Sequence, residues 1–422
     1  MAELRQFQFR TNQGADFPLS LSSRKVDAKL PGPYIIEEVR STPGFLSLRD
    51  EWNTLVLEQA NATVFQTWEW NFHVWKYSEA KSNKLHILLV REKKGSLIGI
   101  APFYSYERFI LGFRFRIVEF IGKNFTDYRD FIVRHDCTNL VYDEILVWLN
   151  QNETRWDIVD LQYVSEESHV VKNYNTLFRN FGFRTAIQRH SSCPYLSLRR
   201  DRDFYENIHS QSLVKQIKYK TRKLAKDFDY RFLTISSSLE LEEYFGKFFE
   251  LHRKRRDQKL QRGMFRSEEQ EQLFTNLWSD LLGRGLRLCF LLIDNQAAAC
   301  LCNFAFKNKI YSYQNGLDPR FAKYSLGYII HSLAIREALK EGMEEYDFLL
   351  GSPDYKREWT EQYRTLYRII ISRGFRESIF TTNEKVLGFW RRQFRGSKLI
   401  RKIYGHMSRA SSRARSVVRN LS

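Results

Sequence analysis

Short apolar runs joined by polar turns occur at two places in the chain. In the first half, the runs 85–90 (LHILLV) and 97–104 (LIGIAPFY) are separated by the polar turn REKKGS. In the second half, the runs 286–293 (LRLCFLLI) and 297–306 (AAACLCNFAF) are separated by the short turn DNQ. Two apolar runs joined by a short polar turn are typical of a β-hairpin. The pattern therefore predicts one hairpin in each half.

Each predicted hairpin is followed, further along the chain, by a helix and then a strand. The first half has a helical segment at 140–151 and a strand at 156–164, and the second half has a helix at 328–342 and a strand at 346–351. Both strands open with an aromatic residue and an aspartate. A repeat of about 190 to 200 residues is too long for a solenoid unit, so it predicts two domains of one architecture. We expect an α/β (α+β) fold in which each domain is a mixed, mainly antiparallel sheet flanked by helices.

The two predicted domains lie between segments that show no sustained periodicity. Residues 1–33 are polar and end in Pro31-Gly32-Pro33, so we predict a flexible leader there. We then expect an N-terminal domain over 34–195, a C-terminal domain over 196–380 and a basic tail over 381–422.

The formal net charge of +18 is concentrated in the tail. The segment from Arg391 to Arg419 holds ten Lys and Arg residues and no Asp or Glu, which leaves about +8 on the rest of the chain. Because apolar and basic residues are mixed there, the tail is predicted either to lie on an anionic membrane surface or to be disordered. No run of about 20 apolar residues and no secretory signal core is present, so we expect a cytoplasmic protein, peripheral at the inner membrane face if the tail binds lipid.

The cysteines and motifs exclude several kinds of chemistry. The five cysteines are odd in number and scattered, without C-x-x-C spacing, so we interpret them as reduced core residues. There is no metal-ligand spacing, no P-loop or dinucleotide fingerprint and no Cys/His/Asp arrangement for covalent catalysis. We therefore expect no metal site and no permanently bound cofactor.

A basic helix is predicted at 211–228, between the two halves. Lys215, Lys218, Arg222 and Lys226 recur at helical spacing and form one basic face. An ordinary solvated surface explains this face, and a docking surface for a polyanionic cosubstrate or acceptor is the alternative.

The stretch 309–359 carries the most information about function. It begins with a strand-like alternation, KIYSYQ, and after a loop a helix begins at Ser325. Ser325 is a favourable N-cap, and Gly327 leaves the N–H groups of the first turn accessible, so a phosphate can bind there. Arg320 and Lys323 precede that turn and can add charge-assisted bonds to the same anion. An ordinary capped helix has the same pattern, so both interpretations stay open.

An ordered set of motifs runs through the same stretch: Y-x-Y-x-x-G-x-D, Y-S-x-G, A-I-x-x-A, G, Y-D-F-L-x-G and Y-K-x-x-W. The order resembles the second domain of the CelD-like (cellulose-biosynthesis-type) acyltransferases, a family of the GNAT acetyltransferase superfamily that is similar in layout to the FemAB peptidoglycan aminoacyltransferases. The matching residues are Tyr311, Tyr313, Gly316, Asp318, Tyr324, Ser325, Gly327, Ala334, Ile335, Ala338, Gly342, Tyr346, Asp347, Phe348, Leu349, Gly351, Tyr355, Lys356 and Trp359. Further matches are F-Q-T-x-E-W (Phe65–Trp70), T-D-Y-x-D (Thr126–Asp130) and L-H-x-x-R-R (Leu251–Arg256), so the resemblance spans about residues 50–370.

The resemblance implies two tandem GNAT-like domains with a donor site in the second. The cosubstrate implied is an acyl-CoA, with acetyl-CoA as the expected donor. Its pantetheine arm would lie between the strand at 311–315 and the last strand at Tyr346, and its pyrophosphate would meet the helix start at 325–328. The chain departs from the Q/R-x-x-G-x-G/A phosphate loop of simple acetyltransferases, because it has Lys323-Tyr-Ser-Leu-Gly327-Tyr instead.

The candidate site residues fall into three groups. The predicted catalytic residues are Asp318, Lys356, Tyr313 and Asp347. The predicted cosubstrate-binding residues are Arg320, Lys323, Tyr324, Ser325, Gly327 and Tyr328. The predicted substrate-binding residues are Asp127, Tyr128, His252, Arg256 and Trp359. We also expect the first domain to help build the acceptor cleft, since ligand sites are frequent at domain interfaces.

Acyl transfer requires a base to deprotonate the nucleophile, hydrogen-bond donors for the oxyanion and a proton for the leaving group, and each predicted catalytic residue is assigned to one of these roles. Asp318 is a candidate base, directly or through water, and Asp347 and Asp127 are further candidate carboxylates. The resemblance implies that Lys356 stabilises developing negative charge. Tyr313 or Tyr324 can protonate a leaving thiolate, although buried strand tyrosines are usually core residues.

Three functions stay open from the sequence. The first is direct transfer of an acyl group from acyl-CoA to an amine or hydroxyl of a small or envelope- or polysaccharide-related acceptor. The second is a Fem-like transferase that takes its acyl group from aminoacyl-tRNA, for which the basic helix at 211–228 is suited. The third is an inactive GNAT-fold binding module. Nucleic acid is an expected partner only in the second.

Overall fold

The computed structural model describes residues 34–178, 181–199, 201, 203–258, 264–265, 267–351, 353–373, 379–380 and 382. The predicted leader (1–33) and, apart from Thr382, the predicted tail (381–422) lie outside these residues. Among the helices so described, none combines the length and the apolar character needed to cross a lipid bilayer.

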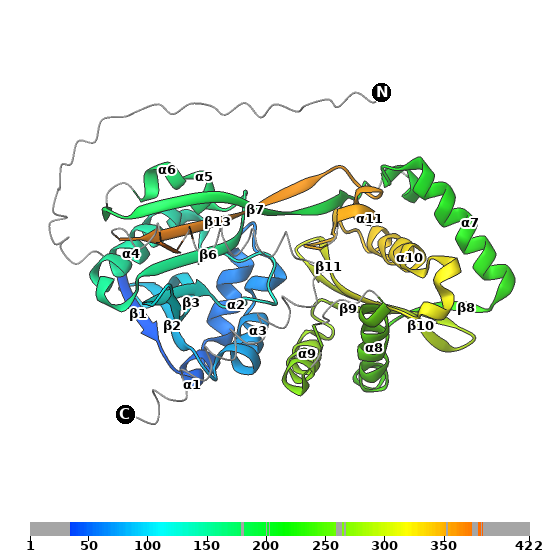
Figure 1. Ribbon diagram of the computed structural model, residues 1–422, viewed down its shortest axis with the longest axis horizontal. Coiled ribbons are helices and arrows are strands. Elements are labelled where there is room, and N and C mark those ends of the chain that lie inside the picture. The colour runs from blue at the N-terminus through cyan, green and yellow to red at the C-terminus, as the bar shows by residue number, and fades with distance from the viewer. Residues whose placement is uncertain are drawn as a thin grey trace.

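The chain forms two units, the first running from β1 to β7 and the second from α7 to β13 (Figure 1). The elements of the first unit are β1 (Tyr34–Val39), α1 (Thr42–Leu46), α2 (Arg49–Glu58), η1 (Val64–Gln66), α3 (Trp68–Val74), η2 (Trp75–Glu79), β2 (Lys84–Glu92), β3 (Leu97–Ile110), β4 (Phe113–Phe120), β5 (Ile132–Val133), η3 (His135–Cys137), α4 (Thr138–Gln151), η4 (Glu153–Arg155), β6 (Ile158–Ser165), α5 (His169–Lys172), α6 (Tyr174–Leu177) and β7 (Arg184–Ser197).

The second unit repeats the plan after a short 3-10 turn, η6 (Phe204–Asn207). Its elements are α7 (Gln211–Asp227), β8 (Tyr230–Thr234), α8 (Ser238–Gln258), α9 (Glu268–Leu281), β9 (Leu286–Ile293), β10 (Gln296–Phe306), β11 (Lys309–Leu317), η7 (Pro319–Tyr324), α10 (Leu326–Lys340), β12 (Glu345–Asp347), α11 (Pro353–Arg357) and β13 (Tyr363–Ser372).

The predicted hairpins and helices are confirmed, and the fold class with them. β2 pairs antiparallel with β3, and β9 pairs antiparallel with β10. The expected strand at 346–351 is wrong in its extent, because β12 ends at Asp347. There Leu349 has a φ of 57° and its N–H donates to Oδ1 of Asp347 at 2.7 Å. That local turn takes the chain out of the sheet, and the apolar run that follows packs in the core instead.

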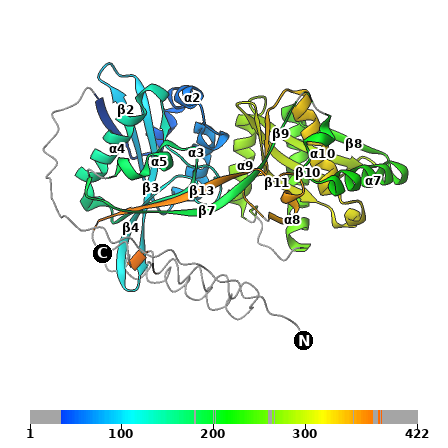
Figure 2. The same ribbon diagram turned by 90° about the horizontal axis from the view of Figure 1, so that it is seen from above.

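The two units exchange their last strands. Each unit contains one parallel pair, β4 with β6 and β11 with β12. β13, which ends the second unit, pairs with β6 of the first, and β7, which ends the first unit, pairs with β12 of the second. β7 and β13 also pair with each other along most of their lengths, so one sheet runs through both units in the order β1-β2-β3-β4-β6-β13-β7-β12-β11-β10-β9-β8. Figure 2 shows the two lobes side by side, joined by these two strands.

The exchange bears on the predicted domain boundary. The predicted C-terminal domain (196–380) includes β13, and β13 lies beside β6 in the sheet of the first unit. A boundary drawn at residue 195 therefore cuts through a shared sheet, and the boundary itself stays a prediction.

An aromatic core also joins the two units. Trp70 on α3 packs edge-on against Phe304 on β10 and Phe274 on α9, with ring centroids 5.2 and 6.5 Å apart. Together with Tyr313, these residues belong to one buried cluster that spans both units. A second cluster lies on the other face of the second-unit sheet, under α7 and α10, and a third lies under α4. All five cysteines are buried and unpaired, as predicted.

Candidate functional site

The parallel strands β11 and β12 separate after three residue pairs. The last pair joins Tyr311 to Asp347, after which β12 ends while β11 continues to Leu317. The register between β10 and β11 shifts at Cys302 and Asn303, so Tyr313 is an extra residue in β11, as in a β-bulge. Irregular strand ends of this kind leave backbone and side chains unpaired on one side, and they are frequent next to binding sites.

A cavity of about 290 Å³ lies where the two strands have separated. We call it the donor pocket. Its walls come from the end of α8, the end of β11, η7, the start of α10 and α11. The residues that line it are Arg255, Gln258, Asn315, Leu317, Asp318, Pro319, Phe321, Ala322, Ser325, Leu326, Gly327, Tyr328, His331 and Tyr355.

The start of α10 gives one wall of the donor pocket an attraction for anions. Ser325 occupies the N-cap position as predicted, but its φ is 54° and its side chain makes no capping hydrogen bond. The first N–H groups of α10 therefore have no side-chain cap and carry the positive end of the helix dipole. A Cβ placed on Gly327 would meet only Cδ1 of Leu317, at 3.5 Å. Packing within the protein does not require this glycine, so its missing side chain leaves room in the pocket.

Asp318 lines the pocket at the start of η7 and carries a negative charge. Its side chain caps η7 and accepts from the guanidinium of Arg320 at 2.9 Å, with Lys254 at 3.4 Å. Burial acts to raise the pKa of Asp318, but the hydrogen bonds from Arg320 outweigh it, so the pKa lies below its usual value. Arg320 is therefore engaged with this carboxylate, and the exposed Lys323 lies over the ring of Tyr324 at 4.8 Å.

His331 is a pocket residue that the sequence analysis missed. Its side chain is 2% exposed, its Nδ1 lies 3.1 Å from the hydroxyl of Tyr346, and its Nε2 has no partner among the described residues. Burial lowers the pKa of His331 to about 3, with the charges of Arg255 and Lys356 acting in the same direction, so the imidazole is neutral. The available clue was a histidine on the apolar face of the helix that begins at Ser325.

Asp347 belongs to a buried ion-pair network outside the pocket lining. Its Oδ2 accepts from the hydroxyl of Tyr128 at 2.6 Å and from Nη1 of Arg364 at 3.1 Å. Arg364 also pairs with Glu345 and, through Nε, with Glu167 of the first unit. Burial raises the pKa of Asp347 to about 6, although Tyr128 and Arg364 oppose the shift. The network ties the end of β12 to the first unit.

Lys356 holds the chain segment that follows β12. Its Nζ donates to the carbonyl oxygens of Phe348, Leu349 and Leu350 at 2.6, 2.8 and 2.9 Å. Burial lowers the pKa of Lys356 to about 8, and the neighbouring Asp127 acts in the opposite direction. Asp127 is partly buried and accepts from the N–H of Leu350 at 3.2 Å. Both side chains thus act on the same segment from opposite units.

Four predicted site residues lie on the donor-pocket lining: Asp318, Ser325, Gly327 and Tyr328. The other predicted residues are not part of that lining. The hydroxyl of Tyr313 donates to the carbonyl of Phe125 in the shared core at 2.8 Å, and that of Tyr324 donates to Asp227 at 2.6 Å. His252 and Arg256 both contact Oε1 of Gln314, at 3.3 Å each.

Trp359 is fully buried behind the pocket, against Tyr328, Phe348 and His331. Its ring packs on the protein side of Tyr328 and His331, which line the cavity, so it supports the pocket wall from the core. The roles predicted for all these residues stay predictions.

Comparisons with known proteins bear on the fold. Residues 211–357 match the family model of a GNAT acetyltransferase domain. The chain has a GNAT-type acyltransferase fold. The matched segment contains every residue of the donor pocket.

Solved structures of similar fold cover most of the chain. A structure of FemX is 10% identical and covers 79% of this chain and 98% of its own, with a TM-score of 0.56. The C-terminal domain of a protein described as a lysylphosphatidylglycerol synthetase, from Agrobacterium fabrum, is 9% identical and covers 82% and 97%, with a TM-score of 0.50. A conserved protein of unknown function from Bacteroides thetaiotaomicron is 9% identical and covers 81% and 100%, also at 0.50. A search of curated protein sequences found no match.

Proposed function

We propose that this chain is a CelD-like N-acyltransferase that moves an acyl group, in the simplest case acetyl, from acyl-CoA to an amine or hydroxyl. The acceptor is a small molecule or an intermediate of envelope or polysaccharide synthesis. The observation that carries the proposal is the donor pocket, which combines an uncapped helix start with the separated ends of β11 and β12. It lies inside the segment that matches a GNAT acetyltransferase domain.

The donor pocket offers distinct contacts to the two ends of an acyl-CoA. The N–H groups at the start of α10, beside Ser325 and Gly327, suit the pyrophosphate. Arg255, at the end of α8, is partly buried and adds a positive charge to the pocket lining. Most of the other lining residues are uncharged. The pantetheine arm and the acyl group then extend toward Asn315, where β11 has no partner strand on the β12 side. No metal is needed for this arrangement.

The reaction we propose is a direct transfer. The acceptor nitrogen attacks the thioester carbonyl carbon, a C–N bond forms, the C–S bond breaks, and the released sulfur takes a proton. Asp318 is ionised and lines the pocket, so it can take the proton of the amine directly or through water. His331 can donate from Nε2 to the carbonyl oxygen if the hydroxyl of Tyr346 donates to Nδ1. The N–H donation from Asn303 to the same hydroxyl favours that direction.

Lys356 fits a positioning role in this mechanism. The resemblance assigned it to the oxyanion, but its ammonium group donates to three carbonyls of the segment behind the pocket. We propose that it shapes the wall next to Tyr355, which lines the pocket.

The second candidate is a Fem-like transfer from aminoacyl-tRNA, and one observation favours it. Lys215, Lys218, Arg222 and Lys226 on α7 are all exposed, as predicted, and Asp227 at its end is the only acidic residue of the helix. Lys220 donates to the carbonyl of Lys323 at 2.6 Å, so α7 lies against the loop that leads into the donor pocket.

Thermal denaturation of the purified full chain separates these candidates. Acetyl-CoA at about 100 times its Kd should stabilise the folded state by about 2.7 kcal/mol. The variant Gly327→Trp, which fills the pocket, should lose that shift, while the distant surface variant Lys94→Glu should keep it. A shift with aminoacyl-tRNA alone, abolished by charge reversal on α7, would replace the acyl-CoA proposal by the Fem-like one. No shift with either donor would favour an inactive binding module.

The location we propose is the cytoplasm, with the basic tail (381–422) in contact with an anionic membrane surface. Co-sedimentation with anionic liposomes should fall when the tail is deleted. Equal binding by the shortened chain would contradict the membrane role of the tail.

A further inference from the structure

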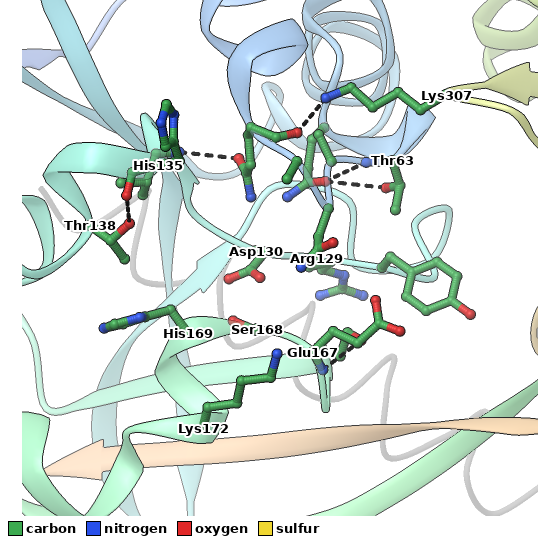
Figure 3. Close-up of a pocket in the computed structure, with 18 of the residues that line it drawn as sticks. Thr63, Arg129, Asp130, His135, Thr138, Glu167, Ser168, His169, Lys172 and Lys307 are labelled. Carbon is green, nitrogen blue, oxygen red and sulfur yellow. Dashed lines mark hydrogen bonds between the residues drawn. The ribbon is translucent and has the colours of Figure 1, made fainter.

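A second cavity, of about 310 Å³, lies in the first unit and reaches the edge of the second (Figure 3). We call it the first-unit cavity. Three segments of the first unit form most of its wall: the link after α2 (59–66), the η3–α4 start (135–142) and the segment after β6 (165–172). Arg129 and Asp130, in the loop that follows β4, complete it.

The same three kinds of segment line the donor pocket. There the wall consists of the end of α8, the η7–α10 start and α11, which follows β12. In each unit, therefore, the cavity lies between the C-terminal end of α2 or α8, the start of the crossover helix (α4 or α10) and the segment that follows β6 or β12. The two cavities also have similar volumes, about 310 and 290 Å³. The duplication has thus kept a cavity at one position in both units.

The first-unit cavity differs in being closed by cationic residues. Lys307 and Lys309, at the turn between β10 and β11, and Arg364, on the exchanged strand β13, come from the second unit. With Arg129 and Lys172, five Lys or Arg residues line it, against two carboxyl groups, those of Asp130 and Glu167. Burial raises the pKa of Asp130 to about 7, opposed by Ser168 and the N–H of Phe131, so repulsion of an anion by this carboxyl is weakened at neutral pH.

Three of these cations have no carboxylate at ion-pair distance within the described part of the chain. Arg364 and Lys309 pair with Glu345, and Lys307 donates to backbone carbonyls. Lys172 is exposed and has no such pair. Arg129 is only 2% exposed and donates to the carbonyls of Lys123 and Thr126, and its Nη1 has no hydrogen-bond partner among the residues that the structure describes. A buried guanidinium nitrogen without a partner is costly unless something else accepts its hydrogen bond.

Further donors lie beside the same space. Figure 3 shows Arg129, Asp130, Ser168, His169 and Lys172 around one hollow. Nε2 of His169 has no partner among the described residues, and its ring stacks on Tyr142 at 5.0 Å. The first turn of α4 has no side-chain cap, so its N–H groups are also available.

We propose that the first-unit cavity is a second ligand site, which takes a small phosphorylated molecule with its phosphate bound between Arg129, Lys172 and the start of α4. An arginine, a lysine and a helix start are the three groups that most often hold phosphate. The remaining wall, with Gln59, Asn61 and Thr63, offers neutral hydrogen bonds to the rest of such a ligand. The proposal does not depend on acyl transfer, since binding can be measured without turnover.

Calorimetric titration of the full chain tests the proposal with three probes: inorganic phosphate, glucosamine 6-phosphate and CoA. The sugar phosphate and CoA separate a phosphosugar ligand from a nucleotide one. Lys172→Glu should weaken binding of the phosphate probe about tenfold, because it replaces a charge-assisted bond by repulsion. Ala60→Trp, at an exposed position of the cavity wall, should block the cavity. Lys94→Glu is the matched control and should bind like wild type.

The outcomes separate this site from the donor pocket. Binding that survives Gly327→Trp but is weakened about tenfold in Lys172→Glu and lost in Ala60→Trp supports the first-unit site, whichever probe gives it. Binding that is lost only in Gly327→Trp assigns the phosphate to the donor pocket and overturns the proposal. Absence of binding by all three probes overturns it as well, and leaves the proposed donor chemistry to be judged by acetyl-CoA alone.

Discussion

Replacing Gly316 by alanine should destabilise the protein markedly, because α8 passes directly against β11 at this residue. A Cβ there would lie 2.5 Å from the backbone nitrogen of His252 and 2.6 Å from the carbonyl carbon of Leu251. Sγ of Cys300 would be 2.8 Å away. The first two atoms belong to helix backbone, so no side-chain rotation relieves the contact. Relief requires α8 to move by about 1 Å, and overpacking of this kind costs about 1–3 kcal/mol or more.

The expected loss of unfolding free energy is about 3 kcal/mol for Gly316→Ala. Urea unfolding followed by tryptophan fluorescence measures it. Gly327→Ala is the matched control, because its Cβ would lie 3.5 Å from Leu317, an ordinary contact, and the change should stay within about 0.5 kcal/mol. Because Arg255 on α8 lines the donor pocket, Gly316→Ala should also weaken donor binding. Equal stability of the two variants would refute the packing argument.

Three further predictions concern buried polar groups. Burial raises the pKa of Glu79 to about 7 against N–H bonds from Gly122 and Lys123, so its folded pKa exceeds the unfolded value. Relative to Glu79→Gln, wild type should therefore lose stability as pH rises from about 4 to 7, measured by urea titrations across that range. Arg364→Met leaves buried carboxylates unpaired and should cost about 3–5 kcal/mol in the same assay; a loss under 1 kcal/mol would contradict the network. His331→Phe should lower kcat about 10²-fold with little change in KM, followed by release of CoA thiol; an unchanged kcat would exclude it from the chemistry.

Local sequence patterns were sufficient to predict the two hairpins, the helices that follow them and the duplication of this plan. The hairpins at 85–104 and 286–306 and the helices at 140–151 and 328–342 follow from periodicity and turn residues, which act over a few residues. The start of α10, where Ser325 and Gly327 line the donor pocket, follows from the same local preferences. The sequence by itself thus determined the two hairpins, their crossover helices and the repeat of this plan in the second half.

Only the tertiary structure decided how the two halves are joined. Whether β13 pairs with β6 or β12 depends on edges far apart in the chain, which hydrophobic alternation does not distinguish. The same holds for side-chain partners. Lys356 donates to three carbonyls, and Tyr313 points into a core built from both units, although both lie in motifs that suggested catalysis.

The first-unit cavity was hidden from the sequence for the same reason. Arg129, Lys172 and Lys307 are far apart along the chain, and only the packing of the second unit against the first brings them to one cavity. Periodicity indicates which face of an element is buried, because the apolar residues of that face recur at the repeat of the helix or strand itself. It does not report what that face meets, because long-range contacts are chosen by the shapes and charges of the assembled elements.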